Sequence, residues 1–243
     1  MSAAREGARA RGAATEPLTA PVEDYLKAIY TIGRGTGAAA TNDIAQRLAL
    51  APASVSGMVR RLADQGLLAY ERYHGVKLTD TGRRAALRTL RRHRVIEAYL
   101  AQALGYPWDR VHAEAERLEH AASDELVDRM AVTMGEPEVD PHGAPIPTRE
   151  GAVDETEYTS LADLAVGVPG VVVRVADEDP AMLRYLAELS VVPGRRVTVK
   201  ARAPYGGPLT LGVGRQEISV GPAVAAHVLT APVTAKAAGG SRG

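Results

Sequence analysis

Apolar residues in the N-terminal third of the chain recur with the spacing of short amphipathic helices. Between residues 22 and 33, four apolar side chains fall at i, i+3, i+4 and i+7, which predicts a helix with one buried face. The same pattern predicts a short helix capped by Thr41 or Asn42. A third helix is expected over residues 52–64, because it opens with proline and Gly66 follows its last turn.

Two short apolar runs follow these helices. Residues 67–72 and 76–78 are rich in strand-forming side chains and flank a His74-Gly75 turn, which predicts a two-stranded hairpin. A helix, a tight turn, a second helix and a two-stranded wing are together typical of the winged helix-turn-helix, a DNA-binding unit.

The middle of the chain predicts two long helices joined at a Gly-Tyr-Pro break. The first begins at Thr79 or Asp80, and its N-terminal half is rich in arginine. The second is expected from Trp108 to Met134. The apolar positions of this pair exceed what one face of a small fold would bury. We interpret the surplus as a homodimer interface, since DNA readers of this type usually present two recognition helices about one turn of DNA apart.

The last third of the chain predicts a small β-barrel. Valine-rich runs punctuated by glycine and proline follow a proline-rich linker, and a helix over residues 180–189 interrupts them. The predicted fold is mainly α with a C-terminal small β-barrel. Its expected parts are a disordered tail (1–21), a winged helix-turn-helix domain (22–85), a helical metal-binding and dimerisation domain (86–147), a linker (148–165), the barrel (166–233) and a second disordered tail (234–243).

Composition limits both the expected cellular location of the protein and the kinds of metal ligand that it can provide. The chain holds no cysteine, so thiolate ligands and disulfides are excluded. The N-terminal residues lack the apolar core of a signal peptide, and no run approaches the ~20 apolar residues of a membrane span. We therefore expect a cytoplasmic protein without a membrane partner, whose metal sites would use nitrogen and oxygen donors.

Charge is unevenly distributed along the chain, although the formal net charge is zero. Residues 22–94 carry seven more basic than acidic side chains, whereas residues 95–160 carry eleven more acidic than basic ones. This division fits DNA bound by the front part and cations bound by the middle, although ordinary surface charge would also produce it. Small outward side chains would let the helix over residues 52–64 press into a major groove. The candidate DNA contacts are Ala51, Ala53, Ser54, Ser56, Gly57, Arg60 and Arg61, with Tyr73 and Lys77 on the wing.

Imidazole and carboxylate groups recur on the two central helices. His93 and Glu97 lie at i and i+4 on the first helix. The second carries a stripe at i, i+4, i+7 and i+8, formed by His112, Glu116, Glu119 and His120. Convergent nitrogen and oxygen donors suit a divalent metal ion. A solvated face with i, i+4 ion pairs would use the same residues, so the pattern alone leaves both interpretations open.

As a set, these features resemble the diphtheria toxin repressor family, the iron- and manganese-dependent bacterial repressors. The resemblance extends from about Val22 to Val233, and the C-terminal part looks like the FeoA-like barrel of that family. The motifs that carry it are EDYLKAIY at 23–30, DIAQRLALAPASVSGMVRRLADQGLL at 43–68, RRHRVIEAYL at 91–100, VHAEAERLEH at 111–120 and DPHGAPIP at 140–147.

The resemblance implies a homodimeric, metal-dependent transcriptional repressor of metal-ion homeostasis genes, bound to a palindromic double-stranded operator. It also implies two divalent ions per subunit. By position, the regulatory ligands would be Asp24, Glu116, Glu119 and His120, and the ancillary ligands would be His93, Glu97 and His112. Further candidates taken from relatives are Asp140, Asp177, Glu178 and Asp179.

Two of these positions bear on the identity of the metal. Iron-type members tend to have methionine and cysteine where this chain has Asp24 and Glu116, whereas manganese-type members tend to have acids. Hard oxygen donors suit Mn(II), so the expected activator is Mn(II), with Fe(II) as the alternative.

Two other functions compete with this one. A metal-dependent hydrolase could also use a His/Glu cluster, but the chain offers no HExxH, GxSxG or phosphate-binding loop. An apo-active regulator could use the same residues only to stabilise its dimer.

Overall fold

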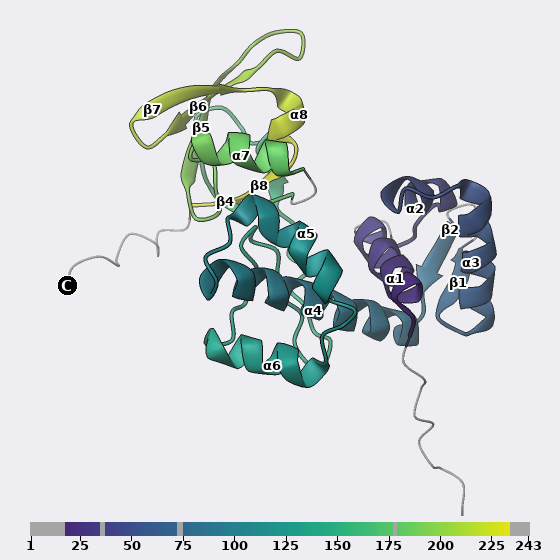
Figure 1. The fold of residues 1–243 in the computed structure, drawn as a ribbon. Coiled ribbons are helices and arrows are strands. Elements are labelled where there is room, and N and C mark those ends of the chain that lie inside the picture. The colour runs from purple at the N-terminus through teal and green to yellow at the C-terminus, as the bar shows by residue number, and fades with distance from the viewer. Residues whose placement is uncertain (1–17, 35–36, 72–74, 177–178, 234–243) are drawn as a thin grey trace, which may run out of the picture. The chain divides into compact units, whose positions relative to one another are not determined.

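The computed structural model describes residues 18–34, 37–71, 75–176 and 179–233, and the chain divides into two compact units (Figure 1). The first unit ends at Gly82 and the second begins at Arg83. Three predicted site residues, Tyr73, Asp177 and Glu178, lie outside the described residues, as do positions 1–17 and 234–243 of the predicted tails. Among the described helices, none combines the length and the hydropathy that a membrane span requires.

The first unit is a winged helix-turn-helix. Its elements are α1 (Ala20–Gly33), α2 (Thr41–Arg47), α3 (Pro52–Asp64) and the antiparallel strands β1 (Leu68–Glu71) and β2 (Gly75–Leu78). The expected bounds of α3 are confirmed, and Val55, Val59 and Leu62 form its buried side. The expected cap of α2 is wrong, because Ala40 occupies the N-cap position and makes no side-chain hydrogen bond.

The cap differs because a backbone pairing fixes the chain just before α2. Ala39 and Val76 of β2 exchange two backbone hydrogen bonds, of 2.8 and 3.0 Å. The neighbouring Gly75 has a φ of +105°, and a Cβ there would lie 2.0 Å from the Ala39 carbonyl oxygen. The pairing therefore holds the chain extended up to Ala40 and decides where the helix starts.

Three helices form the first part of the second unit. They are α4 (Asp80–Gln102), whose first residues belong to the first unit, α5 (Trp108–Leu118) and α6 (Asp124–Thr133). The expected single helix from Trp108 to Met134 is wrong. The Ser123 side chain accepts a hydrogen bond of 3.2 Å from the Leu126 amide, which caps α6 and starts it as a separate helix.

The C-terminal part of the second unit is an antiparallel six-stranded sheet in the order β3-β8-β4-β5-β6-β7. The strands are β3 (Thr159–Ser160), β4 (Pro169–Val175), β5 (Arg196–Arg202), β6 (Leu209–Val213), β7 (Gln216–Val220) and β8 (Val228–Pro232). Two helices, α7 (Pro180–Glu188) and α8 (Pro222–Ala225), complete it, and the core consists mostly of buried valine and leucine. Among the described residues no pairing joins β3 to β7, so the sheet is open and barrel closure is not confirmed.

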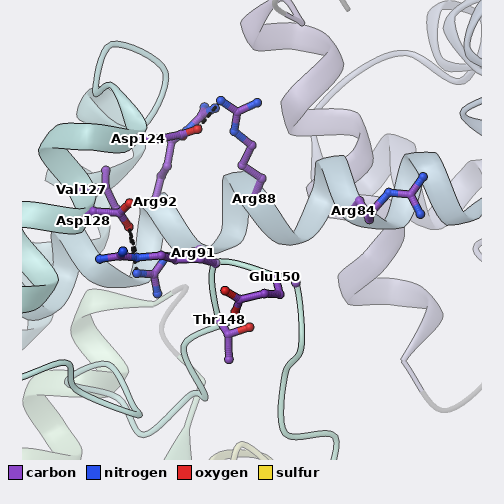
Figure 2. A pocket seen from close by; sticks show the side chains of 11 residues that line it. Arg84, Arg88, Arg91, Arg92, Asp124, Val127, Asp128, Thr148 and Glu150 are labelled. Atoms are coloured by element: carbon purple, nitrogen blue, oxygen red, sulfur yellow. Dashed lines mark hydrogen bonds and ion pairs between the residues drawn. The ribbon is translucent and has the colours of Figure 1, made fainter. Parts of the chain in front are cut away.

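An ion-pair network fastens α4 to the start of α6. Asp124 accepts a hydrogen bond of 3.0 Å from Nε of Arg92 and also pairs with Arg88, as Figure 2 shows. Burial raises the pKa of the Asp124 carboxyl, but the hydrogen bonds and charges of the two guanidinium groups outweigh it, so the pKa lies below its usual value.

Replacing Asp124 by asparagine is expected to lower the melting temperature at pH 7 by a few degrees. The carboxyl is 44% exposed, so the loss should be about 1 kcal/mol or less. Because the folded-state pKa is depressed, the contribution is present above the unfolded pKa of about 3.9 and is lost as pH falls through the folded pKa. Thermal unfolding from pH 7 down to pH 3 should therefore show the two proteins converging. Glu125→Gln, which removes a highly exposed pair with Arg129 on the same helix, should show almost no shift at any pH.

Candidate metal centre

Three predicted ligands from two helices meet in the second unit. His93 and Glu97 lie one turn apart on α4, and His112 faces them from α5. The Nε2 atom of His93 lies 3.0 Å from Oε1 of Glu97 and 3.0 Å from Nδ1 of His112. The third side of this triangle, from His112 Nδ1 to Glu97 Oε1, is 3.1 Å. Donor atoms about 3 Å apart match neighbouring ligands of an ion that binds oxygen and nitrogen at roughly 2.1 Å.

A fourth side chain, His142, faces this triangle from the turn over residues 140–144. Its Nε2 donates a hydrogen bond of 2.8 Å to the Trp108 carbonyl, and its ring stacks on the Trp108 indole. That bond requires a proton on Nε2, and Nδ1 lies 3.9 Å from Oε1 of Glu97. In its neutral form the imidazole would offer the Nδ1 lone pair to a cation, whereas the protonated form places a positive charge beside the carboxylate. His142 was not among the ligands predicted from the sequence, although it lies in the DPHG motif. The candidate from that motif was Asp140, two residues earlier.

Asp140 shapes the turn that presents His142. Its Oδ1 accepts hydrogen bonds from the backbone amides of His142 and Ala144, at 2.8 and 2.9 Å. Its Oδ2 lies 3.6 Å from Nε of Arg94 on α4. Asp140 also belongs to a buried group with Glu97 and His142 that could hold a metal ion. The structure therefore places Asp140 beside the centre, with one carboxylate oxygen already engaged by the turn.

Two carboxylates at the end of α5 lie next to the triangle. Oε2 of the fully buried Glu119 lies 2.6 Å from Nδ1 of His93, and its Oε1 lies 3.4 Å from Nε2 of His120. Glu116, 41% exposed, places Oε1 3.7 Å from His93 Nδ1 and 3.8 Å from His112 Nε2. Glu119 thus touches one predicted ligand of each site.

The charge state of Glu97 follows from its surroundings. Burial alone would raise the pKa of this fully buried carboxyl, but the charge of His93, hydrogen bonds with His112 and His93, and the charge of His142 hold that pKa well below its usual range. The site therefore favours the carboxylate form, which is the form that binds a cation.

Two other predicted ligands belong to α1 and to the N-cap of α7. Asp24 is half-buried on α1, in the first unit. Asp179 caps α7, where its Oδ1 accepts hydrogen bonds from the amides of Ala181 and Met182, at 2.8 and 3.2 Å. The described structure therefore gives Asp179 a structural role in its own helix.

The predicted DNA-contacting face of α3 is open to solvent. Ala51, Ala53, Ser54, Gly57, Arg60 and Arg61 are exposed, and Ser56 is half-exposed with its hydroxyl bonded to the Pro52 carbonyl. A Cβ added at Gly57 would meet nothing within 4 Å, so this side of the helix has no packing partner among the described residues. On the wing, Lys77 pairs with Glu71 at 3.0 Å.

Family models match most of the chain, and known proteins are similar to it over much of its length. Three family models match: the N-terminal DNA-binding domain of iron dependent repressors over residues 17–76, their metal binding and dimerisation domain over 79–148, and the FeoA domain over 159–232. The chain is 33% identical to the iron-dependent repressor IdeR of Mycobacterium tuberculosis, covering 84% of this chain and 93% of that protein. It is 30% identical to the diphtheria toxin repressor of Corynebacterium jeikeium, covering 67% and 70% of the two chains.

A solved structure is similar over almost the same length. It is a manganese-dependent transcriptional repressor in complex with manganese, 38% identical, with a TM-score of 0.82, and the match covers 87% of this chain and all of that one.

Proposed function

The chain belongs to the diphtheria toxin repressor family of metal-dependent transcriptional repressors, and we propose that Mn(II) is the ion that activates it. Members of this family are regulators rather than enzymes, so the hydrolase alternative is set aside. The observation that carries the proposal is the convergence of the buried His93 and Glu97 and the partly buried His112 on one point.

Two buried atoms support a bound ion at this point. Oε2 of Glu97 and Nδ1 of His142 have no hydrogen-bond partner among the described residues. A buried polar atom without a partner costs about 1–3 kcal/mol, and a bound cation would remove that cost. We therefore add His142 to the predicted ancillary ligands His93, Glu97 and His112, with Asp140 as the residue that positions it.

The second proposed ion would use Glu116, Glu119 and His120, with Asp24 as the ligand that the family resemblance adds. A divalent ion at each site supplies positive charge that offsets repulsion between clustered carboxylates. The protein fixes the arrangement of these ligands: the backbone carbonyl of Trp108 accepts a hydrogen bond from Nε2 of His142, and Glu119 links the end of α5 to His93 on α4. Metal would then shift the population toward the DNA-binding conformation by its differential affinity for that conformation.

The donor set favours manganese. Every proposed ligand is a carboxylate or an imidazole, and the chain has no cysteine that could supply a thiolate. Oxygen-rich sites suit Mn(II), whereas sulfur donors favour softer metals. The similar solved structure is itself described as manganese-dependent. The same proposal includes a homodimer on a palindromic operator, a cytoplasmic location and, for the C-terminal part, the small FeoA-like barrel that the family resemblance implies.

The test is a fluorescence-anisotropy titration of operator DNA at fixed salt, in buffer stripped of metal by a chelator. Mn(II) and anaerobic Fe(II) are varied over the micromolar range, with Glu116→Cys as the variant. We expect tight DNA binding with Mn(II), weaker binding with Fe(II), and a shift of roughly tenfold toward Fe(II) in the variant, because a thiolate is the softer donor. An equal response to both metals in the natural protein would contradict the manganese assignment. A response to neither would favour the apo-active regulator.

A further inference from the structure

A small pocket lies on the side of α4 that faces away from the metal centre. It has a volume of about 230 Å³ and is enclosed by α4, the first turns of α6 and the segment over residues 148–151 (Figure 2). Four arginines of α4, at i, i+4, i+7 and i+8 from Arg84, line it, so helical periodicity gathers them on one stripe. His93 and Glu97 fall on roughly the opposite stripe of the same helix. The pocket is therefore distinct from the proposed metal sites.

The lining of this pocket carries an excess of positive charge. Arg149 adds a fifth guanidinium, while Asp124, Asp128 and Glu150 supply three carboxylates. Glu136, outside the lining, also lies 3.8 Å from Arg149, so the guanidinium groups exceed the carboxylates by one. All of these residues lie in the second unit. A concave surface with this balance attracts anions.

The guanidinium groups share their carboxylates in pairs. Arg88 and Arg92 both contact Asp124, while Arg91 and Arg149 contact Asp128 at 3.1 and 3.0 Å. Figure 2 shows Arg88 and Arg92 converging on Asp124, with Arg91 directed to Asp128 and Arg84 farther toward the start of the helix. Because a guanidinium has five N–H donors and the side chains of Arg88 and Arg149 are exposed, these two can offer donors to a ligand as well as to their carboxylates.

The arginines differ in exposure: two are largely buried, at the floor of the pocket, and two are exposed, at its rim. The side chains of Arg92 and Arg91 are only 10% and 15% exposed, and Arg91 also donates a hydrogen bond of 2.9 Å to the Pro147 carbonyl. Arg88 and Arg149, in contrast, are 63% and 48% exposed. A ligand can thus enter past the rim and find donors already fixed at the floor, which lowers the entropic cost of binding.

We propose that this pocket binds a small anion with two or more negative charges, carried by phosphate or carboxylate groups. Planar guanidinium groups recognise both through paired N–H···O bonds. The volume is below the roughly 300–1,000 Å³ of pockets for drug-sized ligands, so the ligand is of the size of phosphate, pyrophosphate or a short polycarboxylate. Such an ion would add acceptors for guanidinium groups that already share Asp124 and Asp128.

The experiment is isothermal titration calorimetry of the metal-free full-length chain with inorganic phosphate, pyrophosphate and citrate. Ionic strength is held constant with chloride. We expect saturable binding at one site per chain, stronger for the more highly charged anions. The double variant Arg88→Gln/Arg149→Gln should weaken it at least about tenfold, because two charge-assisted contacts are lost at exposed positions that the fold tolerates. Arg129→Gln, which removes an exposed arginine of α6 that does not line the pocket, should bind as the natural chain does.

Three results would overturn the proposal. One is the absence of saturable heat with all three anions, and another is equal binding by the double variant. The third concerns the other source of phosphate, the DNA backbone. If the double variant reduced the salt dependence of operator binding, as loss of phosphate contacts does, these arginines would belong to a DNA contact. Because the titration uses metal-free protein, its outcome is separate from that of the manganese proposal.

Discussion

Replacing Glu119 by glutamine is expected to weaken metal-dependent DNA binding by about 100-fold or more, while the fold is retained. Glu119 is fully buried, with one oxygen 2.6 Å from His93 and the other 3.4 Å from His120. Glutamine preserves the shape but removes the negative charge that a cation and its imidazole ligands require. Loss of a carboxylate that only supports a metal ligand already costs about 10–100-fold, and Glu119 is proposed to be a ligand itself. Fluorescence anisotropy with operator DNA and Mn(II) measures DNA binding, and calorimetric titration with Mn(II) measures metal binding.

The matched control is Glu114→Gln on the same helix. Glu114 pairs with Arg117 at 3.0 Å and contacts none of the proposed ligands in the described structure, so its variant should respond to Mn(II) as the natural chain does. The apo-active alternative makes a different prediction for Glu119→Gln. Under that alternative the variant would lose dimer stability, measured by analytical ultracentrifugation, without any change in its response to metal.

Replacing Gly143 by alanine is expected to destabilise the second unit by at least about 2 kcal/mol and to weaken metal binding at the same time. Gly143 has a φ of +86°, and a Cβ there would lie 1.9 Å from the Val173 carbonyl oxygen on β4. Backbone cannot move aside as a flexible side chain can, so the turn over residues 140–144 would have to shift. His142 lies in this turn and bonds to β4 through its own carbonyl, at 2.9 Å from the Val175 amide. Displacing it would remove one proposed ligand.

Gly135→Ala distinguishes the steric contact with Val173 from the cost of a side chain in the left-handed backbone region. Gly135 has a similar φ of +78°, but a Cβ there would meet nothing within 4 Å. It should therefore show only the cost of the left-handed backbone, about 1–2 kcal/mol, and should keep its metal affinity. Thermal unfolding and metal titration of both variants provide the comparison. Equal effects in the two variants would show that the contact with Val173 does not matter.

The sequence alone determined the elements whose residues are neighbours along one helix or strand. The bounds of α3 follow from the proline at its start and the glycine after its last turn. The pairing of His93 with Glu97 follows from helical periodicity, because residues three and four apart share a face whatever packs against them. The family followed from the motifs, because they occur in a fixed order between residues 23 and 147, and the models of the DNA-binding and metal-binding domains match the same segments.

Only the tertiary structure decided what depends on contacts between distant segments. The start of α2 is set by the pairing of Ala39 with Val76, and the break between α5 and α6 falls where Ser123 caps the second helix. His142 points to Glu97 because Trp108, 34 positions earlier, holds its ring and its proton. Nor could the sequence show that Asp124 and Asp128 each take two arginines and leave a positively charged pocket between α4 and α6. Periodicity places a side chain on a face, but the partner it meets there depends on how the rest of the chain packs.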